Sequence, residues 1–404
     1  MSDLLFENLL VLDCASYIAG PAAATMLGDF GARVIKIEPP KTGDAYRQLI
    51  EMPGTPLSEQ NYFWMLDNRN KEGLALDLKQ PAARALLDRL IAKADVFVTN
   101  FPLPIREQLK LAAKDVMRHN ERLIYASLTP YGEKGPEKDR KGFDATAWWA
   151  RSGLMSAVRA DASAEPVRSI SGIGDHPTAV ALFAAIVTAL YRREISGKGG
   201  EVSTSLLANG LWTNGCYVQA ALCGATFVPR PPRYERNPLL EAYRCRDGRW
   251  FTLSLVNHAR EWPLLADCAG QPQLAADPRF ASLSARQTHA GTLTRILEDI
   301  FRAEDLVTWQ TRLIAAGVTF SPIAEPNDHL ECPQVRANDM LPAFADAPEL
   351  RTVANPVCLA GETKVAARMA PELGQHSLAI LEELGISAAE TAELRRAGAV
   401  GFAT

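Results

Sequence analysis

Residues 9–38 read LLVLDCASYIAGPAAATMLGDFGARVIKIE, and this stretch decides the fold. Two apolar runs in it, residues 9–13 and residues 33–38, are typical of short buried strands. Between them lies a predicted helix of small residues that Pro21 opens and Gly31 closes, because proline is tolerated in a first helical turn and glycine commonly ends a helix. This order predicts two parallel strands of one sheet.

The same alternation continues through the first third of the chain. Apolar runs at 74–78, 95–100 and 123–130 predict further strands, and the segment PAARALLDRLIAKA after the first of these runs predicts a helix. We therefore expect an α/β fold with a parallel sheet and helices on both of its faces. The loops at the carboxyl ends of such strands are the places where ligands bind.

A chain of 404 residues is too long for one ordinary core, and its composition suggests two linkers. A proline- and arginine-rich stretch begins near residue 226, and a second stretch, rich in proline and aspartate, covers about 321–348. Between them we expect a smaller α+β unit with a hairpin at 241–246 and 249–255 and helices near 260–270 and 290–316. A strand near Asn355–Ala360 and a helix that Gly385 ends are predicted after the second linker.

The predicted domains follow from these linkers. They are 1–225 as the first part of a large domain, 226–325 as a small α+β domain with its linkers, and 326–404 as a linker and a C-terminal return to the large domain.

Composition excludes several classes of function. The net charge is −4 and no long basic run occurs, which argues against nucleic acid or an anionic membrane surface as a partner. No apolar run approaches the roughly 20 residues that span a bilayer, and the N-terminus lacks the basic region of a secretory signal. The seven cysteines are scattered without a CxxC pair, and the six histidines show no HExxH spacing. We expect a cytoplasmic protein with reduced cysteines and no metal.

One aspartate lies in a glycine-rich bend before a long apolar helix. The stretch SGIGDHPT, residues 171–178, places Asp175 after two glycines and two residues before Pro177, which fits a first helical turn. Asp175 could simply cap the helix, because aspartate accepts hydrogen bonds from the free N–H groups there. It could also be a nucleophilic carboxylate that forms a covalent acyl intermediate. This stretch alone leaves both interpretations open.

Three other loops are polar at the predicted strand ends. They are Asp67–Lys71, Asn100–Pro102 and Lys141–Asp144. Together they could bind a phosphorylated ligand that contains adenine, although each residue taken singly could be an ordinary solvated loop residue. The first loop, residues 14–21, lacks the GxGxxG pattern of a dinucleotide site, so Glu38 at the end of the second strand is weak evidence for a nicotinamide cofactor.

These segments together resemble the family III CoA-transferases, also called the carnitine-CoA/formyl-CoA transferase or CaiB/BaiF family. The resemblance covers essentially the whole chain. It is carried in order by the opening segment with its AGP turn and VIKIE strand, then by DNRNKEGLALDLK, ADVFVTNFP, YGEKGPEKDRKGFD, SGIGDHPTAVALFAAIVTALYRRE, GKGGEVSTSLL and APELGQHSLAILEELG.

The resemblance implies two interlocked ring-like subunits, each with a Rossmann-like large domain built from both chain ends and an inserted small domain. It implies that Asp175 is the nucleophile and that a CoA thioester is a substrate, with no permanently bound cofactor. The residues that it implies for CoA binding are Tyr17, Ile18, Ala19, Lys71, Asn100, Phe101 and Lys141, with Arg106 two residues away from the position where the family often has a basic residue. Pro39 replaces another basic residue, for which Lys41 could substitute.

The family fold leaves two alternatives to CoA transfer. The α-methylacyl-CoA racemases have histidine at the position of Phe143, and phenylalanine cannot act as an acid or base. His176 could replace that base, although we expect it to be a surface residue of the first helical turn. The second alternative is a non-catalytic CoA-binding protein, against which the retained Asp175 argues.

Substrate choice is predicted by resemblance and composition together. Residues 254–258 contain no glycine where the formyl- and oxalyl-type members have a glycine-rich loop, which argues against formate or oxalate as the acceptor. We expect succinyl-CoA as the donor and a small dicarboxylic or sulfinic acid as the acceptor. A second acidic group would need an arginine, and Arg47 is a candidate together with Arg230, Arg233 and Arg236. The further candidates that line the acceptor site are Gly174, Asn257 and His258.

Overall fold

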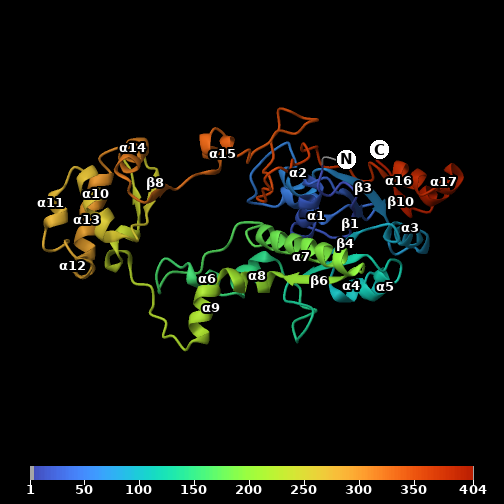
Figure 1. The fold of residues 1–404 in the computed structure, drawn as a ribbon, viewed down its shortest axis with the longest axis horizontal. Helices are drawn as coiled ribbons and strands as arrows, with labels where there is room; N and C mark the ends of the chain where they lie inside the picture. The colour runs from blue at the N-terminus through green and yellow to red at the C-terminus, as the bar shows by residue number, and fades with distance from the viewer. Residues whose placement is uncertain (1–3, 404) are drawn as a thin grey trace. The chain divides into compact units, whose positions relative to one another are not determined.

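The computed structural model describes residues 4–403, and they form two compact units. The large unit combines residues 4–157, 168–224 and 334–403, so it contains segments from both ends of the described chain (Figure 1). The small unit combines residues 158–167 and 225–333. The domain ranges given by the sequence stay a prediction.

A seven-stranded sheet forms the centre of the large unit, in the order β10-β3-β2-β1-β4-β5-β6. Its strands are β1 (Leu10–Asp13), β2 (Arg33–Glu38), β3 (Lys71–Leu76), β4 (Val96–Thr99), β5 (Ile124–Thr129), β6 (Gly200–Ser205) and β10 (Val400–Gly401). Every neighbouring pair is parallel except β10 and β3, which pair antiparallel at one edge. The predicted α/β fold with a parallel sheet is confirmed, and the antiparallel edge strand is an addition that the sequence patterns did not predict.

The order of the strands reverses at β1. The chain first adds β2 and β3 on one side of β1, and it then returns to place β4 and β5 on the other side. Leu12 of β1 accordingly pairs with Ile35 of β2 and with Phe97 of β4. In open parallel sheets, ligands bind outside the carboxyl ends of the strands at such a reversal. The fold therefore predicts that a ligand binds near the loops after β1 and β4.

Helices cover both faces of the sheet because alternate residues of each buried strand point to opposite faces. Val11 and Val34 pack in the core on one face, and Leu12 and Ile35 pack in the core on the other. The first face is covered by α1 (Ala19–Asp29) and α7 (Asp175–Ser196), and the second by α3 (Pro81–Ile91), α5 (Ala113–Met117) and α16 (Ser377–Glu383) (Figure 1).

The other helices of the large unit are shorter. They are η1 (Ala45–Glu51), α2 (Tyr62–Asn68), α4 (Leu103–Gln108), the π-helical η2 (Ala145–Ala150), α6 (Leu154–Ala157), α8 (Leu206–Thr213), α9 (Gly215–Leu222), α15 (Pro333–Ala337, which begins at the last residue of the small unit) and α17 (Ala388–Arg396).

The small unit has an antiparallel sheet in the order β7-β8-β9. Its elements are η3 (Arg233–Glu235), η4 (Pro238–Leu240), β7 (Ala242–Arg244), β8 (Trp250–Leu253), α10 (His258–Cys268), α11 (Gln273–Ala276), α12 (Leu283–Thr288), α13 (Ala290–Phe301), α14 (Leu306–Ala316), β9 (Phe320–Pro322) and η5 (Pro326–His329). Its core is aromatic, and the Phe301 ring centroid lies 4.9 Å from those of Tyr243 and Phe251.

Two predicted elements differ from the structure. The third strand begins at Lys71 and not at residue 74, because Asp67 and Asn68 belong to the preceding helix α2 and the chain enters the sheet directly after it. The strand predicted near Asn355–Ala360 does not form. The Asn355 side chain accepts a hydrogen bond from the Val357 N–H, and Pro356 has no N–H, so this segment lacks the free donors of a regular ladder.

A buried carboxylate ties three distant segments of the large unit together. Asp29, at the end of α1, accepts two hydrogen bonds from the Arg69 guanidinium, from Nε at 3.0 Å and from Nη2 at 2.6 Å. Asn70 and Asn355 donate their side-chain amides to the same carboxylate at 3.2 and 2.7 Å. The C-terminal segment is therefore held to α1 by a charged group that water does not reach.

We expect Asp29→Asn to destabilise the large unit strongly, because it leaves the buried Arg69 charge without its partner. Breaking one side of a buried ion pair costs about 3–5 kcal/mol of unfolding free energy. A urea titration followed by intrinsic fluorescence should show the midpoint falling. The matched control is Glu72→Gln, which breaks a half-exposed pair with Arg33 and should change the unfolding free energy by less than about 1 kcal/mol. Equal midpoints for the two variants would contradict the prediction.

Candidate active site

Asp175 is the first residue of α7, and its side chain does not cap that helix. The N-cap position is occupied by Gly174, and no side-chain hydrogen bond caps the helix start. Within residues 4–403 the Asp175 carboxylate has no hydrogen-bond or salt-bridge partner, although the residue is partly buried. The capping interpretation is therefore wrong, and the carboxylate is left available for chemistry.

The glycine bend is required by close packing on both sides of Asp175. A Cβ atom at Gly174 would lie 2.5 Å from the indole ring of Trp148, so no other residue fits there. Gly172 has a φ of +79°, in the left-handed region that favours glycine, and a Cβ there would lie 3.2 Å from the imidazole of His176. The two glycines of the bend therefore pack directly against the side chains of Trp148 and His176.

The electrostatic surroundings make Asp175 an unusual acid. Burial raises its pKa to about 7, and the nearby carboxylates of Asp144 and Asp67 raise it as well, while His176 acts in the opposite direction. The glycine bend holds Asp144 close to Asp175, because the Asp144 carboxylate accepts a hydrogen bond from the Gly174 N–H at 3.3 Å. Asp175 therefore changes its charge close to neutral pH.

His176 is not the simple surface residue that the sequence suggested. Its Nε2 lies 3.0 Å from Oδ1 of Asp67, and the other oxygen of that carboxylate accepts a hydrogen bond from the Tyr46 hydroxyl at 2.5 Å. Asp67 and Tyr46 are buried, while the His176 side chain is 44% exposed. Sequence reasoning placed Asp67 in a polar loop and missed Tyr46, because neither residue is near Asp175 in the chain.

The loops after β1 and β4 are held together at the strand reversal. Asn100 accepts a hydrogen bond from the Ser16 N–H at 2.8 Å and donates one to the Ser16 carbonyl at 2.6 Å. Tyr17 has a φ of +63°, rare for a non-glycine residue, and its N–H donates to Asp44. Asn100 therefore fixes the backbone of the first loop, and Phe101 follows it at the start of the next loop.

The loop after β5 contacts the loop after β1. The ring of Phe143 makes an edge contact with the ring of Tyr17, with centroids 5.5 Å apart, and Lys141 is exposed two residues earlier. Ile18 and Ala19 are buried, and the Ile18 side chain lies next to the glycine bend at Gly172. The structure thus brings these loops together with the start of α7.

Lys71 occupies a different kind of position from the one implied by the resemblance. Its ammonium group is buried and donates to the Asp13 carboxylate, the carbonyls of Pro21 and Asp67, and the side chain of Asn68, all at 2.8–2.9 Å. Burial lowers its pKa to about 8. This geometry favours a structural role, and direct contact of Lys71 with CoA stays a prediction.

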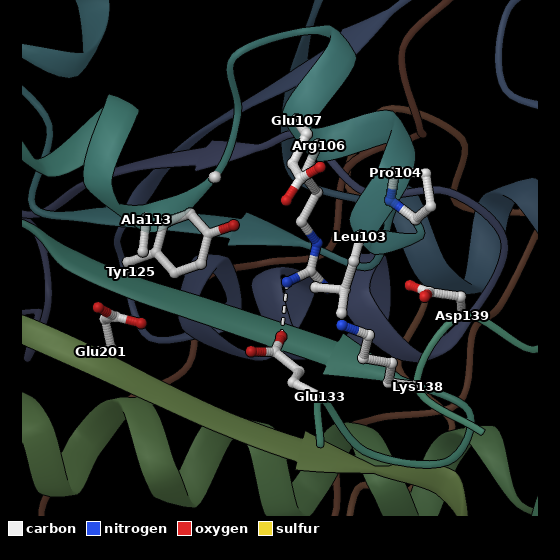
Figure 2. A pocket seen from close by; sticks show the side chains of 11 residues that line it. Leu103, Pro104, Arg106, Glu107, Ala113, Tyr125, Glu133, Lys138, Asp139 and Glu201 are labelled. Atoms are coloured by element: carbon white, nitrogen blue, oxygen red, sulfur yellow. Dashed lines mark hydrogen bonds and ion pairs between the residues drawn. The ribbon is translucent and has the colours of Figure 1, made fainter. Parts of the chain in front are cut away.

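Arg106 is also engaged within the protein. Its Nε donates to the Phe101 carbonyl at 2.6 Å, and its other nitrogens reach Leu128 and the Glu133 carboxylate. Figure 2 shows it pointing from α4 toward Glu133, on the wall of a cavity of about 250 Å³ that Lys138 and Asp139 also line. Asp175 is not among the residues that line this cavity.

The residues predicted for the acceptor are not all free to bind an anion. Arg47 makes two hydrogen bonds to Glu38 and lies over the Trp64 ring. In the small unit Arg233 and Arg236 pair with Glu241. Asn257 precedes α10, and the His258 ring contacts Arg286 at 3.3 Å. Gly174 is the one acceptor candidate that lies beside Asp175 in the chain.

Across residues 4–403, no three His, Cys, Asp or Glu side chains gather in a way that could hold a metal ion. None of the helices in that range combines the length and apolar character needed to cross a membrane.

Comparison with known proteins identifies the family of the chain. The sequence profile of CoA-transferase family III matches residues 6–377. The chain is 32% identical to the (R)-2-hydroxy-4-methylpentanoate CoA-transferase of Clostridioides difficile, over 95% of this chain and 96% of that protein. It is 29% identical to the succinyl-CoA:glutarate CoA-transferase of Mus musculus, over 94% of this chain and 86% of that protein.

The fold agrees with a solved structure of the same group. A crystal structure of a CaiB/BaiF family protein from Brucella suis superposes with a TM-score of 0.83 at 26% identity, covering 95% of this chain and all of that one. With an available aspartate beside the loops of a strand reversal, and with a family match across most of its length, the chain belongs to CoA-transferase family III and is a CoA-transferase.

Proposed function

We propose that the protein moves CoA from an acyl-CoA donor to a carboxylic acid through covalent intermediates on Asp175. The observation that carries this proposal is the state of the Asp175 carboxylate. It has no partner within residues 4–403, it lies at a helix start beside the loops after β1, and its pKa is raised to about 7 by burial and by neighbouring carboxylates. A partly desolvated carboxylate is a stronger nucleophile than a solvated one.

The proposed reaction has four exchanges at the same carboxylate. Asp175 attacks the donor thioester carbonyl, the C–S bond breaks, and a mixed anhydride and a CoA thiolate result. The thiolate then attacks the aspartyl carbonyl, which releases the donor acid and leaves CoA bound to Asp175 as a thioester. The acceptor carboxylate attacks this thioester, giving a second anhydride, and the thiolate then attacks the acceptor's carbonyl and frees Asp175. Each step balances without an outside oxidant or base.

Oxyanions form in each exchange and need hydrogen-bond donors. The N–H groups of Gly174 and His176 are already used, by Asp144 and by the Gly172 carbonyl. Donors for the oxyanion must therefore come from other groups, or the Gly174 N–H must leave Asp144 when substrate binds.

We propose that CoA lies at the strand reversal. Tyr17, Ile18, Ala19, Asn100, Phe101 and Lys141 would contact it, because the loops that carry them meet there. Lys71 and Arg106 would act indirectly, since their hydrogen bonds to backbone carbonyls fix these loops.

We propose succinyl-CoA as the donor, in line with the name of the mouse relative, and a small dicarboxylic or sulfinic acid as the acceptor. The relative from Clostridioides difficile is named for a 2-hydroxy acid with a branched apolar chain, so that class belongs in the same acceptor panel. Arg47 would need to leave Glu38 to bind a second acidic group.

The proposed assembly is an intertwined homodimer in the cytoplasm. Helices α7, α8 and α9 carry large apolar side chains that are strongly exposed, among them Tyr191, Ile195, Trp212 and Leu222. Exposed apolar residues in such numbers are typical of surfaces that a partner covers.

Replacing Asp175 with asparagine should lower CoA transfer by at least about 10³-fold while CoA still binds, because the amide cannot form the anhydride. The measurement is mass spectrometry of the peptide containing Asp175 after incubation with succinyl-CoA, where a hydroxylamine-sensitive CoA adduct should appear only with the native residue. Asp115→Asn is the matched control, since Asp115 also lies in the first turn of a helix. A fully active Asp175→Asn variant would overturn the proposal.

Activity should fall as the pH drops below about 7, because the nucleophile must be ionised. A neighbouring negative charge raises the pKa of an acid, so Asp144→Asn should move this acid limb to lower pH, by about half a unit to one unit. Asparagine keeps an oxygen that can accept the Gly174 N–H. The rate of adduct formation in a single turnover, measured from pH 5 to 8.5, tests the shift, and an acid limb that moved upward would contradict it.

Sedimentation equilibrium should give about twice the chain mass of 44.0 kDa. The exposed apolar side chains of α8 and α9 are the physical reason, since their contact with water is unfavourable. A stable species at the mass of one chain would rule out the dimer without affecting the chemistry proposed for Asp175.

A further inference from the structure

A hydrogen-bonded chain of three side chains runs from the interior of the large unit to His176, the residue that follows Asp175 in the sequence. It begins at Tyr46, whose hydroxyl donates to Asp67 at 2.5 Å, and continues from Asp67 to the His176 imidazole at 3.0 Å. His176 and Asp175 are the first two residues of α7. We propose that this chain holds the His176 ring protonated, and that the resulting cation keeps Asp175 in its nucleophilic carboxylate form. The inference rests on the role proposed for Asp175.

Both nitrogens of the ring face acceptors, which is the arrangement that an imidazolium requires. Nε2 faces the Asp67 carboxylate, and Nδ1 lies over the backbone at Gly172. A neutral imidazole has only one N–H, whereas an imidazolium can donate to Asp67 and still present an N–H toward Gly172, whose backbone helps to raise the pKa of the ring. The left-handed Gly172 makes the contact possible, because a Cβ at that position would lie 3.2 Å from the ring.

The position of Asp67 is fixed independently of His176. Its backbone carbonyl accepts hydrogen bonds from the Thr25 hydroxyl and from the buried Lys71 ammonium, and Tyr46 holds one carboxylate oxygen. The side chain of Asp67 is 3% exposed, so its charge is little screened by water. This buried carboxylate gives the His176 ring a defined position at the start of α7.

Burial and neighbouring charges act in opposite directions on His176, and His176 opposes the other groups that act on Asp175. Burial lowers the pKa of His176, but the hydrogen bond and charge of Asp67, the charge of Asp175 and the Gly172 backbone outweigh it and raise the pKa above its usual value. For Asp175, burial, Asp144 and Asp67 favour the neutral acid, and His176 is the group that opposes them. Without this cation, the pKa of Asp175 would rise further and its carboxylate form would be less populated at neutral pH. His176 is thus a positioning residue that acts through Asp175.

The first test is His176→Gln, which keeps an N–H donor for Asp67 but removes the positive charge. We expect the acid limb of adduct formation to move upward by about one pH unit, with the rate recovering at high pH. His119→Gln is the matched control, because His119 also contacts a carboxylate, that of Asp88 at 3.3 Å, and lies outside the site. A purely structural role for the hydrogen bond predicts a native pH profile for His176→Gln, and that result would overturn the inference.

The second test needs no chemistry at Asp175. The protein is labelled with ¹³C at the histidine Cε1 positions, and the His176 signal is assigned by its loss in His176→Gln. Its titration should lie above the ordinary histidine value of about 6.5 and should fall by about one unit in Asp67→Asn. An ordinary titration in the native protein would overturn the inference even if the CoA adduct forms. A missing adduct together with a raised titration would instead overturn the role of Asp175 alone.

Discussion

The buried carboxylate of Asp13 is the charge on which the rest of the large unit depends. It lies at the end of β1 with no exposure to water, between the ammonium groups of Lys71 at 2.8 Å and Lys36 at 3.7 Å. A single unpaired charge at this depth would be very unfavourable, so the three groups must be placed together. Their strands lie in the order β3-β2-β1. The register pairs Asp13 with Lys36, and Lys71 starts β3 beside Val34, two residues earlier, from where its side chain reaches Asp13.

Both lysines also make hydrogen bonds to segments that form the site. Lys36 also binds the Ala15 carbonyl and the carboxylate of Asp44, and Asp44 in turn holds the Tyr17 N–H in its left-handed turn. Lys71 binds the carbonyls of Pro21, at the start of α1, and of Asp67. The first loop and the acid that orients His176 are therefore set by the same buried cluster. This connection gives a structural reason for the burial of Lys71, for which the resemblance to the family had implied contact with CoA.

Close packing of the glycine bend and opposing charges around Asp175 together define the site. The close approach of Gly174 to the Trp148 ring leaves no room for a side chain in the bend that precedes Asp175. Two acids, Asp144 and Asp67, favour its neutral form, and one base, His176, opposes them. A carboxylate with a pKa near 7 would suit the proposed exchange, in which Asp175 is the nucleophile in one step and the leaving group in a later one.

The sequence by itself determined the strand–helix alternation, the parallel sheet and Asp175 in its glycine bend, because these depend on short-range patterns: apolar periodicity, proline at a helix start and glycine at a turn. Its likeness to CoA-transferase family III added the enzyme class. Only the tertiary structure decided that Asp175 does not cap its helix, that Lys71 and Arg47 are engaged in internal pairs, and that Tyr46 and Asp67 reach His176. Tyr46 and Asp67 are 21 positions apart in the chain, and Asp67 and His176 are 109 positions apart. The pairs of Lys71 and Arg47 depend on which oppositely charged groups lie next to them in the folded protein. No local pattern encodes them, because long-range packing chooses the partner of each buried charge.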